Sequence, residues 1–163
     1  MSRFIRMLLL LIIVPTIIPY WLADMAMAEE STGQIRMAYF ELSRLQALST
    51  SNVPYKDYRS ALERAKEKVD LLRDESFPGV GVLRKALAYD EQALAVWRLQ
   101  ADSDFPVDSI RTDEAVGAGI IAECPGIPRF HNKERDQVYV QDAVACLWRK
   151  SAALLNDMPP NLR

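Results

Sequence analysis

Asp90 is the residue whose position most clearly invites a chemical interpretation. It falls in the middle of a broad apolar arc on the helix predicted for residues 80–101, and Trp97 lies on the same arc. An unpaired buried carboxylate costs several kcal/mol, so we expect Asp90 either to be hydrogen bonded or to keep its proton through a raised pKa. The candidate partners are Tyr39, Tyr58, Tyr89, Tyr139, Lys150 or an arginine.

Two interpretations of Asp90 follow. The structural one, which we favour, is a satisfied polar contact that fixes the register of the helices. The functional one is a polar anchor at the base of a small interhelical pocket, with Trp97 and Trp148 as its aromatic walls. Plain core packing is the simpler explanation of both tryptophans.

Most patterns of catalysis and metal binding are missing from the sequence. His131 is the single histidine, and one nitrogen ligand does not predict a zinc site. The sequence has no Cys-x-x-Cys-His, no Glu-x-x-His, no Gly-x-Ser-x-Gly and no phosphate-binding loop. We therefore predict no cofactor, no bound metal and no catalytic residue, and we lean against an enzyme. An enzyme using the acids Glu41, Asp90 and Glu114 is the last-ranked hypothesis.

The first 28 residues have the three parts of a secretory signal peptide. Arg3 and Arg6 form a positive start, an apolar run follows from Met7 to Ala23, and Ala26-Met27-Ala28 supplies small side chains for the peptidase. We expect cleavage after Ala28 and a periplasmic or secreted protein that keeps no membrane span. An uncleaved anchor is the alternative, although two prolines interrupt the apolar run.

Cys124 and Cys146 are the only cysteines in the chain. In an oxidising compartment an even number of cysteines is most simply explained by disulfide bonding, so we predict a Cys124–Cys146 bond. It would contribute about 3 kcal/mol to stability in the chain-entropy model. Two buried free thiols are the alternative if the protein is not exported.

Helical periodicity accounts for most of the remaining chain. We predict that the chain is built around a helical hairpin from Pro54 to Ala101, with a charged outer arm and a buried second arm. The predicted helices cover residues 33–48, 55–72, 80–101 and 133–156, and more weakly 112–122. Prolines and glycines break the pattern in residues 102–132.

These elements predict an all-α fold, an antiparallel up-down bundle of about four helices with one irregular connector tethered by the disulfide. The bundle domain would comprise residues 29–158, and residues 159–163 would form a mobile tail.

Scattered positions also match a pattern seen in one family of exported domains. The matching residues are Asn52-x-x-Tyr55, Gln92, Trp97 and Asp102, and the pair Cys146-Leu147. In this respect the chain resembles the small helical lysozyme-inhibitor domains of the LprI type. It departs from them at Ala101, where the family has an arginine, and it lacks the cysteine after the tryptophan. The resemblance favours a binding or inhibitory role and transfers no functional residue.

The leading hypothesis is an exported, non-catalytic domain that binds a protein partner in the cell envelope as an adaptor, inhibitor or accessory subunit. A small-ligand carrier with a pocket beside Asp90 is the alternative. The formal net charge of −2, with basic and acidic residues interleaved, does not predict nucleic-acid binding. The sequence identifies neither the partner nor the oligomeric state.

Overall fold

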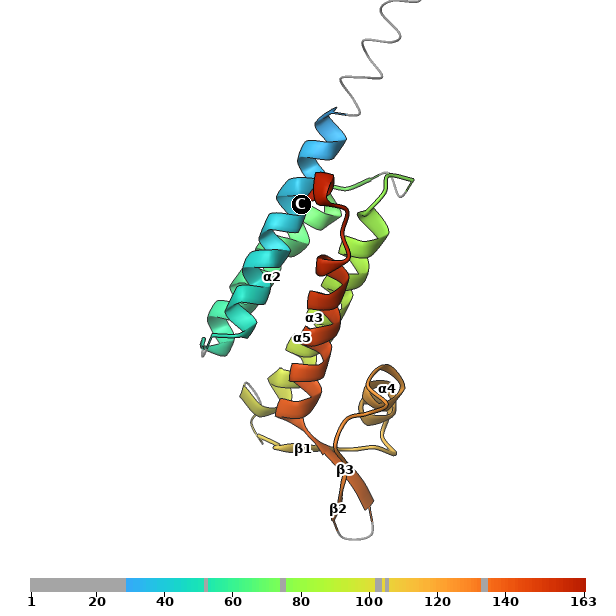
Figure 1. Ribbon diagram of the computed structural model, residues 1–163. Helices are drawn as coiled ribbons and strands as arrows, with labels where there is room; N and C mark the ends of the chain where they lie inside the picture. Colours follow the sequence, from blue (N-terminus) through green and yellow to red (C-terminus); the bar gives the residue numbers. More distant parts are fainter. Residues whose placement is uncertain (1–28, 52, 74–75, 102–103, 105, 133–134) are drawn as a thin grey trace, which may run out of the picture.

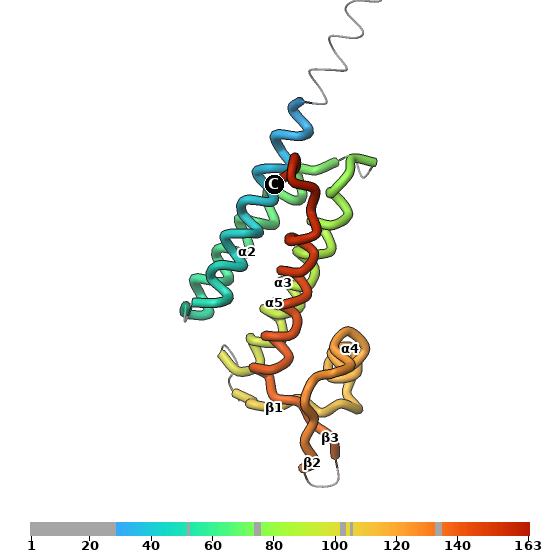
Figure 2. Tube along the Cα trace, in the orientation of Figure 1, coloured from blue at the N-terminus to red at the C-terminus, as the bar shows by residue number. Residues whose placement is uncertain are grey.

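A computed structural model describes residues 29–51, 53–73, 76–101, 104, 106–132 and 135–163. The predicted signal peptide, residues 1–28, lies outside this described part. Figures 1 and 2 show long helices running together, with the strands and a short helix gathered at one end of them. Within the described residues, none of the helices combines the length and the apolar character that a membrane span requires.

The long helices are the N-terminal helix (residues 29–49), α2 (Tyr55–Asp70), α3 (Val80–Ala101) and α5 (Val140–Asn156). Helix α3 packs against both α2 and α5. All four contribute buried apolar side chains to one hydrophobic core. In and just after α2, the residues of the predicted stripe are all buried: Tyr58, Leu62, Ala65, Val69 and Leu72. The apolar periodicity therefore marks the faces that meet in this core.

The N-terminal helix ends where hydroxyl side chains bond to its last carbonyls. Ser49 donates to the carbonyl of Gln46 over 2.8 Å, and Thr50 and Ser51 both donate to the carbonyl of Ala47. Such local bonds compete with the continuing helix ladder. The chain can therefore turn here into α2, which begins directly after Pro54.

The prediction of an all-α fold is wrong, because part of the chain forms a three-stranded antiparallel sheet. Its strands are β1 (Ser109–Arg111), β2 (Phe130–Asn132) and β3 (Arg135–Tyr139), in the order β1-β3-β2. Strand β3 occupies the predicted first turns of the last helix, so α5 begins at Val140. Ile110 pairs with Val138, and both side chains are buried. The correct description is a mostly helical fold with a small sheet and a disulfide.

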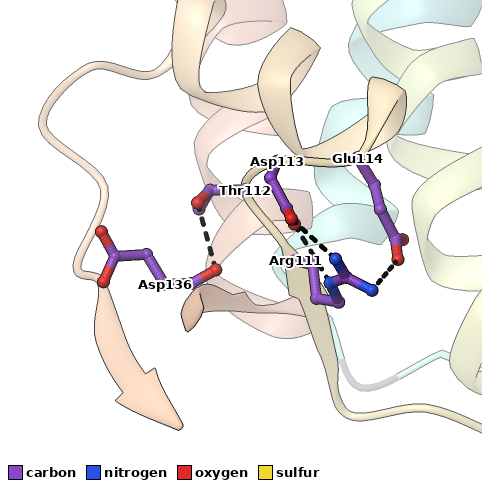
Figure 3. A network of polar contacts seen from close by, with 5 residues as sticks. All are labelled: Arg111, Thr112, Asp113, Glu114 and Asp136. Atoms are coloured by element: carbon purple, nitrogen blue, oxygen red, sulfur yellow. Dashed lines mark hydrogen bonds and ion pairs between the residues drawn. The ribbon is translucent and has the colours of Figure 1, made fainter. Parts of the chain in front are cut away.

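A short helix, α4 (Ala115–Glu123), follows β1 through a tight turn that polar contacts hold in place (Figure 3). The Arg111 guanidinium contacts Asp113 at 2.6 Å and Glu114 at 3.3 Å. The backbone N–H and the hydroxyl of Thr112 both donate to the carbonyl of Asp136, on β3. These contacts connect the start of α4 to the sheet.

Gly117 is the residue that lets α4 approach β1 so closely. A Cβ at this position would lie 2.0 Å from the carbonyl oxygen of Arg111, a backbone atom that cannot rotate away. Gly119, two residues further along and therefore on nearly the opposite side of the helix, would meet nothing within 4 Å. The two glycines of α4 therefore have different roles, and only Gly117 is required by packing.

The predicted disulfide is present between Cys124, which ends α4, and Cys146, in α5. The Lys150 ammonium lies 2.9 Å from a Glu123 carboxylate oxygen, to which the Tyr89 hydroxyl also donates over 2.8 Å. The bond to Lys150 is the main cause of the lowered pKa of Glu123. The end of α4 lies in the segment that was predicted as an irregular connector. It is attached to α5 by the disulfide and by Lys150, and to α3 by Tyr89.

Residues 160–163 dock onto the helices. Pro160–Leu162 form a 3-10 helix, and Leu162 is buried. The Arg36 guanidinium donates to the carbonyl of Asn161 over 2.9 Å, and Arg163 donates to that of Met158 over 2.7 Å. The C terminus accordingly lies beside the N-terminal helix (Figure 1).

Candidate functional site

The Asp90 carboxylate is fully buried and receives donors from three other helices. The Ser151 hydroxyl of α5 donates over 2.7 Å, and the Tyr58 hydroxyl of α2 over 3.1 Å. The Gln46 amide of the N-terminal helix donates over 3.0 Å to one oxygen and lies 3.3 Å from the other. One carboxylate of α3 therefore joins all four long helices.

Burial dominates the electrostatics of this network. It raises the pKa of Asp90 to about 7, although the bonds from Ser151, Tyr58 and Gln46 favour the charged form. Burial, followed by the neighbouring Asp90 charge, also raises the pKa of Tyr58 far above its ordinary range. Side chains of the protein itself donate to both oxygens of the carboxylate, which is the arrangement expected of a residue that holds the helices together.

The two tryptophans predicted as pocket walls come together beside this network. Their ring centroids lie 5.6 Å apart at an interplanar angle of 87°. Tyr58 contacts both rings, at 5.8 Å from Trp97 and 5.2 Å from Trp148, and Tyr55 meets the Trp97 ring at 5.5 Å. Tyr58 thus bonds to Asp90 through its hydroxyl and packs on the tryptophans through its ring.

A cavity of about 230 Å³ opens beside the two tryptophans. Its described lining residues are Ser49, Ser51, Val53, Trp97, Gln100, Gln141, Val144 and Trp148. They come from the end of the N-terminal helix, the segment before α2, and helices α3 and α5. Asp90 is not part of this lining, so the predicted walls face a pocket but the predicted polar base does not.

A second hollow, of about 460 Å³, adjoins the first. It is lined by Gln100, Asp108, Tyr139, Gln141 and Asp142. The two hollows share Gln100 and Gln141, and we call their combined surface the aromatic groove. It runs from the tryptophans at one end, past the two amides, to a tyrosine and two carboxylates at the other.

The aromatic groove is polarised along its length. Its described lining includes the carboxylates of Asp108 and Asp142 and no cationic side chain. Gln100 donates to Asp108 over 2.8 Å, so one of these acids already has a neutral donor. The tryptophan end is uncharged. A ligand that complements the groove would thus be apolar at one end and cationic at the other.

The remaining sequence candidates do not join this site. His131 is exposed and lies 3.1 Å from Asp136, while Glu114 contacts Arg111. No group of three or more histidine, cysteine or acidic residues in the described chain is placed to hold a metal ion. The side chains that donate to Asp90, those of Gln46, Tyr58 and Ser151, are all uncharged.

A separate exposed surface carries large apolar side chains. Met37 and Phe40 lie one turn apart on the N-terminal helix and are 54% and 62% exposed. Met37 and Leu71 line a hollow of about 370 Å³ between this helix and the end of α2. We call Met37, Phe40 and Leu71 the apolar patch.

Comparisons of the chain with models of protein families, with curated proteins and with solved structures find no match. The resemblance to LprI-type domains is not supported by them. We therefore infer the function from the groove and its chemistry.

Proposed function

We propose that this protein is an exported, non-catalytic domain that binds a protein partner in the cell envelope, as an adaptor, inhibitor or accessory subunit. The observation that carries the proposal is the aromatic groove, which combines partly exposed tryptophan surface with amide and carboxylate side chains. Aromatic side chains are enriched where proteins bind one another. In this proposal the N-terminal helix, α2, α3 and α5 act as an up-down bundle that holds the groove rigid.

The contacts of Asp90 favour this function over the small-ligand carrier. A carrier of the kind expected from sequence needs Asp90 at the base of its pocket, with bonding capacity left for the ligand. Asp90 instead accepts bonds from Ser151, Tyr58 and Gln46, and it does not line the cavity beside the tryptophans. The apolar patch adds a second surface of the type that protein partners cover.

Export is supported by the leader-like first 28 residues and by the disulfide, which is compatible with an oxidising compartment. We expect mass spectrometry of the protein from its own cells to find Glu29 as the first residue. A chain that begins at Met1 would favour the anchor instead.

Site-specific photocrosslinking in cells that make the protein tests the binding function. A photoreactive phenylalanine analogue replaces Gln141 in the groove, Phe40 in the apolar patch, or Ser60, an exposed control position on α2. We expect one protein to be crosslinked at Gln141 or Phe40 and not at Ser60. The absence of any adduct specific to those two positions would contradict a protein-binding function.

A further inference from the structure

We propose that the aromatic groove holds a short segment of the partner in the extended polyproline II conformation, in which a large apolar side chain and a basic side chain lie about three residues apart. This inference rests on the proposed protein-binding function and specifies the chemistry of the bound segment. Four observations on the groove lead to it.

The tryptophan end fits one large apolar side chain. Trp97 and Trp148 meet nearly at a right angle, so their rings form a corner, and Val53 and Val144 complete its apolar lining. The cavity of about 230 Å³ is smaller than the roughly 300–1,000 Å³ typical of sites for whole drug-sized molecules. A single leucine, methionine or aromatic side chain is therefore a suitable occupant.

The middle of the groove matches a peptide backbone. Gln100 and Gln141 line both hollows, and each amide carries a donor and an acceptor. Peptide groups present the same pair of functions. An extended segment crossing the two glutamines can thus satisfy its backbone while its side chains reach the two ends.

The acidic end selects a cation. Asp108 and Asp142 line it without a cationic neighbour among the described lining residues. A neutral saccharide would suit the tryptophans and amides, and its hydroxyls could donate to the carboxylates, but it would not neutralise their charge. A lysine or arginine side chain would pair with them, so charge complementarity favours a basic peptide over a sugar.

The geometry of α5 sets the spacing. Asp142 and Trp148 are six positions apart on this helix, which corresponds to about 9 Å along its axis. An extended chain in the polyproline II conformation has three residues per turn and advances by about 3.1 Å per residue, so side chains three residues apart lie on the same side and about 9 Å from each other.

Tryptophan fluorescence provides a direct readout of the groove. The chain has three tryptophans, and a Trp21→Phe substitution leaves only Trp97 and Trp148. The full chain with this substitution is titrated with acetylated, amidated peptides that contain Phe-Ser-Ser-Lys. Matched peptides carry glutamate in place of lysine, or alanine in place of phenylalanine. We expect the lysine peptide to change the fluorescence and each matched peptide to bind at least about fivefold more weakly.

Neutralising the two acids tests the charge argument. Asp108→Asn with Asp142→Asn keeps the side-chain shapes and should weaken the lysine peptide about fivefold at low salt, and much less at 1 M salt. Asp70→Asn with Asp157→Asn changes the net charge equally at exposed positions outside the groove and should leave binding unchanged.

Three results would overturn the inference. They are equal binding of the lysine and glutamate peptides, equal weakening by both pairs of substitutions, and a fluorescence change with chitooligosaccharides but with none of the peptides. If the crosslinking still captures a partner at Phe40, the protein-binding function stands and only the inference about the groove fails. If neither the crosslinking nor the fluorescence titration shows binding, the protein-binding function and the inference about the groove both fail.

Discussion

The Ser151 hydroxyl donates to the Asp90 carboxylate over 2.7 Å and so connects α5 to α3 in the middle of the core. Both side chains are fully buried. Since Tyr58 and Gln46 donate to the same carboxylate, this bond belongs to a network that spans all four long helices. A buried network of this kind stabilises the fold only while every member keeps its partner.

Removing the acceptor should therefore cost more than removing the charge. We expect Asp90→Ala to lower the free energy of unfolding by about 3 kcal/mol or more, because three donors lose their partner. Asp90→Asn keeps an acceptor, and the hydroxyls of Tyr58 and Ser151 can rotate to accept from its amide, so its loss should be about 1 kcal/mol. Urea unfolding measures both. Asp70→Ala, at an exposed site, should stay within about 0.5 kcal/mol; equal losses for all three variants would exclude a network role.

The free energy of unfolding should depend on pH because Asp90 titrates with a raised pKa in the folded protein. Its pKa in the folded protein is about 7, above the ordinary 3.8, so the folded state retains a proton that the unfolded state has lost. The bound proton therefore stabilises the folded state by about 4 kcal/mol. This stabilisation is fully present below about pH 4 and is lost as the pH rises to 7. The difference in unfolding free energy between the wild type and Asp90→Asn isolates it, since the other carboxylates are common to both. A difference that stays constant from pH 4 to pH 8 would contradict the raised pKa.

The disulfide should contribute to stability without being the main source of it. Cys124 and Cys146 are 22 residues apart, so replacing both by alanine should lower the free energy of unfolding by about 3 kcal/mol. Reducing agent should shift the urea midpoint of the wild type in the same direction and leave the double variant unchanged. A reductant effect on the double variant would show that something other than this bond is responsible.

The two glycines of α4 should respond to alanine with opposite signs. Gly117→Ala places a Cβ against the Arg111 carbonyl and should destabilise the protein by at least about 2 kcal/mol. Gly119→Ala meets open space and should stabilise it by up to about 1 kcal/mol through helix propensity. Thermal unfolding of the two variants measures both effects. A Gly117→Ala protein as stable as the wild type would mean that β1 and α4 are not packed as described.

The helices were predictable because their apolar residues repeat over several turns. The sheet was not, because each strand has at most five residues, and in β3 only Val138 is buried. So short a segment carries almost no alternation, and the helical periodicity of the following residues extends over it. The strands are specified by pairing between residues far apart, such as Ile110 and Val138, which a local pattern does not contain.

The candidate site was predictable in part for the same reason. The position of Asp90 on an apolar arc indicated its burial, and Tyr58 was among the candidate partners. Gln46 and Ser151 were not, because their contacts depend on how the helices are aligned. Trp97 and Trp148 meet as pocket walls, yet the groove needs Gln100 and Gln141 from different helices, and only the tertiary structure brings these together.

The bond between Cys124 and Cys146 also closes a covalent ring around the β2–β3 hairpin. A protease that cuts this hairpin once would leave both pieces attached to each other through sulfur. The nicked protein would keep its mass, apart from one added water, until the disulfide is reduced. A protein with this connectivity can lose the continuity of its backbone at the hairpin without releasing either half.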